Sequence, residues 1–178
     1  MLWSIGLLAL VMVGALYTNL AVAAKIRDRM ADGAPRTLDG MAYMKYAEYR
    51  DQQTSIDVAA DLAAILWLQR NAVGSPVIVE AHTTEYKYGG RYTINTGLPG
   101  VIGWSWHQRQ QRAVTPAGLV TDRVRDVEEF YKAVDVSGAL AFVRKYDVTY
   151  VVVSGYERAY YPKEGLDKFA LMVDAEML

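Results

Sequence analysis

Residues 1–24 have the sequence MLWSIGLLALVMVGALYTNLAVAA, which contains no charged side chain, and Lys25 is the first charged residue of the chain. In a helix that rises about 1.5 Å per residue, the segment from Leu2 to Ala24 is about 34 Å long, and the hydrocarbon core of a bilayer is about 30 Å thick. The sequence therefore predicts one transmembrane helix over residues 1–24 of an integral membrane protein.

A cleaved secretory signal peptide is the alternative interpretation of this segment. Ala21-Val22-Ala23 has the small-residue pattern of a cleavage site. The apolar run is longer than an ordinary signal-peptide core, however, and no Lys or Arg precedes it. These two features favour an uncleaved helix.

The orientation of the predicted helix is ambiguous. Lys25, Arg27 and Arg29 follow it directly. The positive-inside rule places such residues, and the domain after them, in the cytoplasm if no earlier helix sets the topology.

The composition excludes several classes of protein. The 178 residues carry 20 acidic and 19 basic side chains, which does not favour a nucleic-acid partner. There is no cysteine and there are only two histidines, so neither a disulfide scaffold nor a thiolate or histidine-rich metal site can form. The chain has no G-x-G-x-x-G, P-loop or G-x-S-x-G motif, and we expect no cofactor.

Beyond the first helix, the sequence indicates a connector over residues 25–53 and one soluble domain over residues 54–178. Gly33, Pro35 and Gly40 interrupt the connector, which leaves room for a short helix over residues 40–49. About 150 residues follow the first 24, which is the size of one ordinary domain.

Hydrophobic periodicity predicts the elements of that domain. In chain order they are a helix over 54–71 capped by Thr54 or Ser55, a buried strand over 77–81, an irregular segment over 82–120, helices that begin at Asp122 and Ser137, a strand over 148–153 and a helix over 165–173. This alternation predicts the α/β class, with a small, mostly parallel sheet covered by helices on both faces.

The first candidate site lies after the first predicted strand. Glu80 is at its carboxyl end, where open α/β sheets bind ligands, and His82, Glu85 and Arg91 follow. The alternative is a structural role in which Glu80 caps a nearby helix or pairs with Arg91.

The second candidate site is the segment around Trp104 and His107. Aromatic side chains offer flat apolar faces with one polar edge, which suits a sugar ring. Arg109 and Arg112 are three residues apart, so on a helix they are neighbours and can bind a phosphate or carboxylate together. The alternative places the aromatic rings in the core and pairs the arginines with the acidic helix around residues 126–129.

Several short motifs recur in a characteristic order. They are residues 37–43, 64–68 with Asn71, 79–81, Tyr86, Arg91, 96–99, Gly103-Trp104, His107, Arg112, 150–158, Tyr161 and Lys168-Phe169. Together they resemble a family of uncharacterised multi-span membrane proteins of bacteria and archaea, often labelled the YYY membrane proteins. Gln108 and Gln111 depart from that pattern, where an acidic residue and a tryptophan are expected.

This resemblance implies more than the residues show. Members look like C-type glycosyltransferases, with many transmembrane helices, lipid-phosphate-linked sugar donors and a soluble extracytoplasmic domain after the last helix. The chain would match only that last helix and that domain. The catalytic acidic residues would then lie between earlier helices, outside this chain, and those helices would be its partners.

We therefore expect a membrane-anchored accessory domain that contacts a lipid-phosphate sugar or its acceptor and is not catalytic alone. The candidate contacts are Glu80, His82, Arg91, Trp104, His107, Arg109 and Arg112. Two alternatives remain. One is an interaction or scaffold protein anchored by a single helix. The other is an anchored hydrolase that uses Glu80 with His82 or His107.

Overall fold

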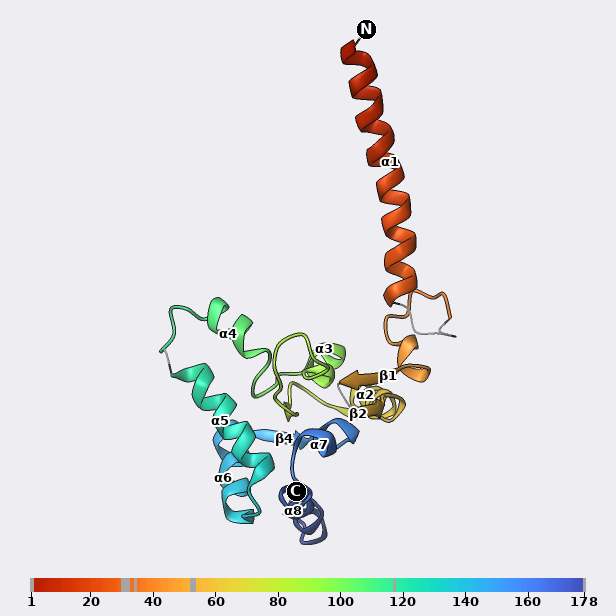
Figure 1. The fold of residues 1–178 in the computed structure, drawn as a ribbon. Helices are drawn as coiled ribbons and strands as arrows, with labels where there is room; N and C mark the ends of the chain where they lie inside the picture. Colours follow the sequence, from red (N-terminus) through yellow and green to blue (C-terminus); the bar gives the residue numbers. More distant parts are fainter. Residues whose placement is uncertain (1, 30–32, 34, 52–53, 117, 178) are drawn as a thin grey trace. The chain divides into compact units, whose positions relative to one another are not determined.

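A computed structural model describes residues 2–29, 33, 35–51, 54–116 and 118–177. The chain divides into two compact units, Met1–Ala47 and Glu48–Leu178, which we describe one at a time (Figure 1).

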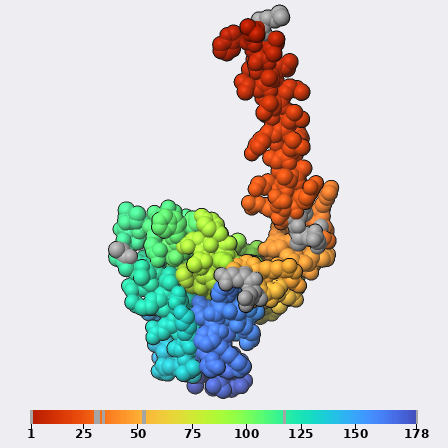
Figure 2. Space-filling view, in the orientation of Figure 1, coloured from red at the N-terminus to blue at the C-terminus, as the bar shows by residue number. Residues whose placement is uncertain are grey.

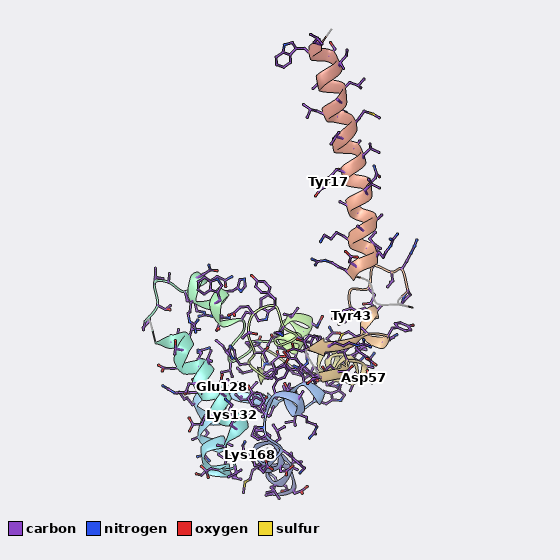
Figure 3. All side chains as sticks on the ribbon, viewed as in Figure 1. Tyr17, Tyr43, Asp57, Glu128, Lys132 and Lys168 are labelled. Atoms are coloured by element: carbon purple, nitrogen blue, oxygen red, sulfur yellow. The ribbon has the colours of Figure 1, made fainter. Side chains whose placement is uncertain are left out.

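The first unit is dominated by one long helix, α1, over Leu2–Arg29. Its 28 residues include no buried side chain, and the helix is long and apolar enough to cross a membrane. Figure 2 shows its side chains projecting without any covering layer, and Figure 3 shows Tyr17 among them. Arg27 and Arg29 lie in the last turn, where positive charge interacts favourably with the helix dipole. The prediction of a helix of membrane-spanning length at the N-terminus is confirmed.

The connector is more ordered than its composition indicates. A single 3₁₀ turn, η1, covers Ala42–Lys45 in place of the helix predicted over 40–49. Asp39 accepts a hydrogen bond from the backbone N–H of Met41 at 2.9 Å and so starts the turn. Ala42 and Met44 are buried.

The second unit begins with an antiparallel pair of strands, β1 (Glu48–Asp51) and β2 (Thr54–Asp57). The predicted helix start at Thr54 or Ser55 is therefore wrong. Ile56 is buried between two exposed neighbours, which is the two-residue alternation of a strand. The helix α2 instead covers Ala59–Asn71.

A second pair of strands lies at the centre of this unit. β3 (Val77–Val79) and β4 (Val148–Val151) pair in parallel, and Gly100 adds a single parallel bridge to Ile78. The buried strands at 77–81 and 148–153 are thus present but shorter than predicted.

The predicted fold class, a mostly parallel α/β sheet covered by helices, is wrong. Among the described residues the strands form only two small sheets of two strands each, and most of the remaining ordered structure is helical. The physical reason is that residues 82–120 fold into turns and two short helices. Among residues 82–116 and 118–120, which the structure describes, there is no strand that could extend the β3–β4 pair.

Six helices complete the second unit in the part of the chain that the structure describes. They are α3 (Arg91–Thr96), α4 (Ser105–Gln111), α5 (Leu119–Lys132), α6 (Val136–Tyr146), α7 (Gly155–Tyr160) and α8 (Lys163–Asp174). The N-cap of α6 is Asp135 rather than the predicted Ser137, because the Asp135 carboxylate accepts the backbone N–H groups of Ser137 and Gly138.

The core joins α5, α6 and α8 through aromatic rings. The ring centroids of Phe130 and Phe142 are 4.2 Å apart, and those of Phe130 and Phe169 are 4.9 Å apart. The buried Tyr131 hydroxyl lies 3.0 Å from the carbonyl of Val79 and 2.9 Å from that of Val152, within hydrogen-bonding distance of both. This hydroxyl ties the helical layer to the ends of both parallel strands.

Candidate functional site

The two predicted site segments form two separate clusters in the second unit. We call the first the Arg91 cluster, formed by Asp61, Glu80, Arg91, Ser154 and Glu157. We call the second the Trp104 surface, formed by Tyr86, Trp104, His107, Arg109 and Arg112. The Arg91 cluster is buried, whereas much of the Trp104 surface is exposed.

The turn before α3 places Arg91 in the interior. Gly90 has a φ of 83°, a left-handed conformation that glycine adopts at little cost, and α3 begins at the next residue. The backbone N–H groups of Tyr92 and Thr93 then donate to the Glu80 carboxylate at 3.1 and 3.0 Å. Glu80 therefore satisfies two of the free N–H groups at the start of this helix.

The Arg91 guanidinium contacts three carboxylates and one hydroxyl. Its nearest oxygens are Asp61 Oδ2 at 2.7 Å, Glu157 Oε2 at 2.9 Å, Glu80 Oε2 at 3.4 Å and Ser154 Oγ at 2.6 Å. The exposed fraction of the four charged residues ranges from 0% to 4%. One buried positive charge thus connects α2, α3, α7 and the end of β3.

The surroundings shift the pKa values of two carboxyl groups of this cluster in opposite directions. Burial raises the pKa of Glu80 in spite of the opposing attraction of Arg91. Burial also acts to raise the pKa of Glu157, but the charge of Arg91 and its hydrogen bonds outweigh it and hold this pKa below its ordinary value. Of these two carboxyl groups, Glu80 therefore takes up a proton more readily.

Glu80 makes the contacts expected for a structural role rather than for ligand binding. It caps α3, and it also pairs with Arg91. With side chains only 1–2% exposed, Glu80 and Arg91 present almost no surface to a ligand. In the described part of the chain, Glu80 has no hydrogen bond to His82 or His107. The geometry therefore gives the Arg91 cluster a positioning role and offers no support for a Glu–His hydrolase.

The Trp104 surface is built on the start of α4. Glu85 accepts hydrogen bonds from Ser105 Oγ at 3.0 Å and from the backbone N–H of Trp106, and so holds the first turn. The rings of Tyr86, Trp104 and His107 pack against one another with centroid distances of 5.2–5.5 Å. Tyr86 is 76% exposed and has a φ of 64°, which is uncommon outside glycine.

Two ring nitrogens of this surface have no hydrogen-bond partner among the described residues, namely Trp104 Nε1 and His107 Nδ1. Tyr86 Oη lies 3.5 Å from the other nitrogen of His107, Nε2. An unsatisfied buried polar atom is costly, and an indole N–H can only donate. Both nitrogens are themselves buried, so they do not face a ligand at the surface.

The two arginines of the Trp104 surface lie on the exposed side of α4 and at its end. The Arg112 guanidinium donates to Gln108 Oε1 at 3.0 Å, and both arginines are exposed. The predicted alternative, ion pairs with residues 126–129, is absent from the described contacts. Asp126 and Glu128 pair instead with Lys145 and Lys132, respectively.

His82 lies apart from Glu80 although the two are close in sequence. β3 ends at Val79, and His82 Nδ1 is 4.0 Å from the Glu128 carboxylate of α5, labelled with Lys132 in Figure 3. Burial lowers the pKa of His82 in spite of the opposing attraction of Glu128 and Glu85. It lines an open cavity of about 430 Å³ whose rim also includes Asp51, Lys87, Lys132, Tyr160 and Tyr161.

Sequence reasoning missed four members of these clusters as site residues. Ser154 and Glu157 have capping-box spacing and form that box at the start of α7, so a search for it would have found Glu157. Asp61 could have been noticed as an acidic residue on the apolar face of α2. Tyr86 gave no signal beyond its place in the motif string.

No family model, no curated protein and no solved structure matches this chain.

Proposed function

We propose that the chain is a membrane-anchored accessory domain that contacts a lipid-phosphate-linked sugar, or its acceptor, beside a glycosyltransferase-like membrane protein. The observation that carries the proposal is the Trp104 surface, where the exposed ring of Tyr86 packs against Trp104 and His107, and where Arg109 and Arg112 are exposed.

The chemistry of this surface fits the two halves of such a ligand. An exposed aromatic face such as that of Tyr86 packs against the C–H groups of a sugar ring, and a tyrosine hydroxyl can bind the sugar hydroxyl groups. Arg109 and Arg112 supply planar cationic groups that bind phosphate oxygens in pairs. A neutral sugar joined to a phosphate presents both features at once.

The membrane location rests on α1. Its length and its continuous apolar surface are those of a single membrane anchor. The resemblance to YYY proteins adds the expectation of an extracytoplasmic domain and of further transmembrane helices as partners.

The domain would not carry out catalysis by itself. Its best-placed acidic residue, Glu80, is 4% exposed and engaged with Arg91 and the start of α3. The catalytic groups would then belong to the neighbouring transmembrane part, as the resemblance implies.

The test is a titration of the full chain in detergent micelles with a short-chain polyprenyl-phosphate mannose. We expect saturable binding that Trp104→Ala weakens by about tenfold or more, since a central aromatic contact typically contributes that much. Trp67→Ala is the matched control because Trp67 is a half-exposed tryptophan on α2, outside this surface.

No binding at millimolar ligand, or an equal loss in both variants, would contradict the proposal. The first outcome would favour the alternative of a single-helix-anchored interaction protein.

A further inference from the structure

We infer that the second unit docks on an anionic phospholipid surface through the α4 face, which we define as Trp106, Arg109, Arg112 and Val114. The inference rests on the membrane anchoring proposed above and names the partner surface of the domain itself.

The charge pattern is the first argument. No Asp or Glu occurs between Glu85 and Asp122. Of the basic residues in that interval, Arg91 is buried against carboxylates and Lys87 pairs with Asp51.

Arg109 and Arg112 remain on the surface without an ion pair in the described part of the chain. The α4 face thus carries these two cations beyond its first turn, where the Glu85 carboxylate is engaged with Ser105 and Trp106, although the whole chain has a net charge of −1.

The second argument is the exposure of large apolar side chains on the same face. Trp106 is 54% exposed and Val114 is 99% exposed. Tryptophan is enriched at membrane–water interfaces, where its ring lies at the level of the lipid headgroups. A tryptophan and a valine beside two arginines match the combination by which peripheral segments bind anionic membranes.

The geometry places three of these residues along one helix, and Val114 follows two residues after its C-cap. Trp106 and Arg109 are three residues apart on α4, so they share a side of the helix, and Arg112 follows after another three residues at its C-cap. Glu85 fixes the start of the helix through Ser105 and Trp106. Figures 1 and 2 show α4 at the surface of the second unit, at the end away from α6 and α8.

A membrane is favoured over a soluble anionic partner because of the anchor. Two arginines and one tryptophan give only weak attraction to a free ligand, but α1 would keep the domain close to a lipid surface. A tether makes the second contact intramolecular and raises its effective concentration. A weak intrinsic affinity for the lipid surface is then sufficient to keep the domain docked.

The absence of cysteine allows a clean test. Val114→Cys and, as control, Val134→Cys each place one label at an exposed valine, the second in the turn between α5 and α6. The full chain, carrying an environment-sensitive fluorophore at either site, is reconstituted into vesicles of phosphatidylcholine with or without phosphatidylglycerol. No polyprenyl lipid is added, so phospholipid headgroups are the only phosphate source.

We expect the label at position 114 to shift to shorter wavelength and to be quenched by nitroxide lipids in the vesicles with phosphatidylglycerol. The label at position 134 should not respond. Arg109→Gln with Arg112→Gln should lower the ratio of docked to undocked domain by about 30-fold, because each arginine lost near an anionic surface costs about fivefold. Arg144→Gln with Arg158→Gln removes two other exposed arginines and should leave the ratio unchanged.

Equal signals from positions 114 and 134 in both kinds of vesicle, with the chain still floating with the vesicles, would overturn the docking and leave the anchoring intact. A chain that does not float with vesicles of either composition would overturn the anchoring, and the docking with it. Docking without binding of polyprenyl-phosphate mannose would support this inference while contradicting the proposed ligand.

Discussion

At the scale of single residues, Lys168 is a buried cation whose described contacts include no carboxylate. It is 2% exposed, and its ammonium group donates to the carbonyls of Ala133 and Gly165 at 2.7 and 2.6 Å (Figure 3). The ring centroid of Phe169 lies 4.2 Å away. The two carbonyls and the aromatic face stabilise the ammonium group, but they do not fully compensate for its loss of hydration.

Lys168 therefore makes stability depend on pH. Burial lowers its pKa to about 8 from the ordinary value of 10.5. Between these values the unfolded chain binds more protons than the folded chain, so the free energy of unfolding rises with pH and this contribution is smallest below pH 8.

We expect Lys168→Met to remove this slope between pH 8 and 9.5. Urea unfolding of the wild type and the variant across that window measures the difference, and tyrosine titration at higher pH stays outside it. Parallel stability curves for the two proteins would contradict the assignment.

At the scale of elements, the Arg91 cluster shows how one residue joins α2, α3, α7 and the end of β3. The most distant contact of Arg91 is with Glu157, which is 66 residues away in the sequence. The intact cluster contributes little net free energy of folding, but removal of its cation is costly because three buried carboxylates then lose their positive partner.

We expect Arg91→Met to destabilise the domain by about 3–5 kcal/mol. The loss should be smaller at pH 5 than at pH 8, because without Arg91 the buried carboxyl groups bind protons more tightly in the folded than in the unfolded chain. Chemical denaturation at the two pH values measures this.

Arg144→Met, a change at an exposed position of α6, is the control and should cost little. An Arg91→Met variant as stable as the wild type at pH 8 would show that the cluster does not hold these elements together.

The elements also show how far sequence reasoning reached. The uncharged run of residues 1–24 predicted α1, and apolar residues at helical spacing predicted α2, α5, α6 and α8. The start of α2 was misplaced, because Thr54 and Asp57 resemble a capping box but pair with β1 instead.

The prediction of the fold class was wrong because it depended on contacts between segments that are far apart in the sequence. Val148–Val151 has the composition of a central sheet strand, yet whether a strand is central depends on neighbours that the rest of the chain must supply. The described part of residues 82–120 supplies one bridge at Gly100 and no strand.

The candidate site residues were chosen by residue type, and they stay a prediction. The segment from Trp104 to Arg112 was recognised by residue type, and the structure places its two arginines at the surface and Trp104 partly buried beside His107. The burial of Glu80 and Arg91 depends on Asp61 and Glu157, which are far away in sequence, so local patterns could not reveal it.

At the scale of the whole molecule, the apolar helix α1 is followed along the chain by a domain whose α4 face carries tryptophan and arginine. The ligand proposed for the Trp104 surface and the docking of the α4 face both presuppose that α1 lies in lipid.

The most direct test of that central claim is carbonate extraction of membranes from cells that express the full chain. We predict that the uncleaved chain stays in the membrane pellet after the wash and enters solution only with detergent. Leu10→Arg with Val13→Arg, which places two charges in the middle of α1, should move it to the supernatant. Recovery of the intact wild-type chain in the aqueous supernatant without detergent would contradict the account.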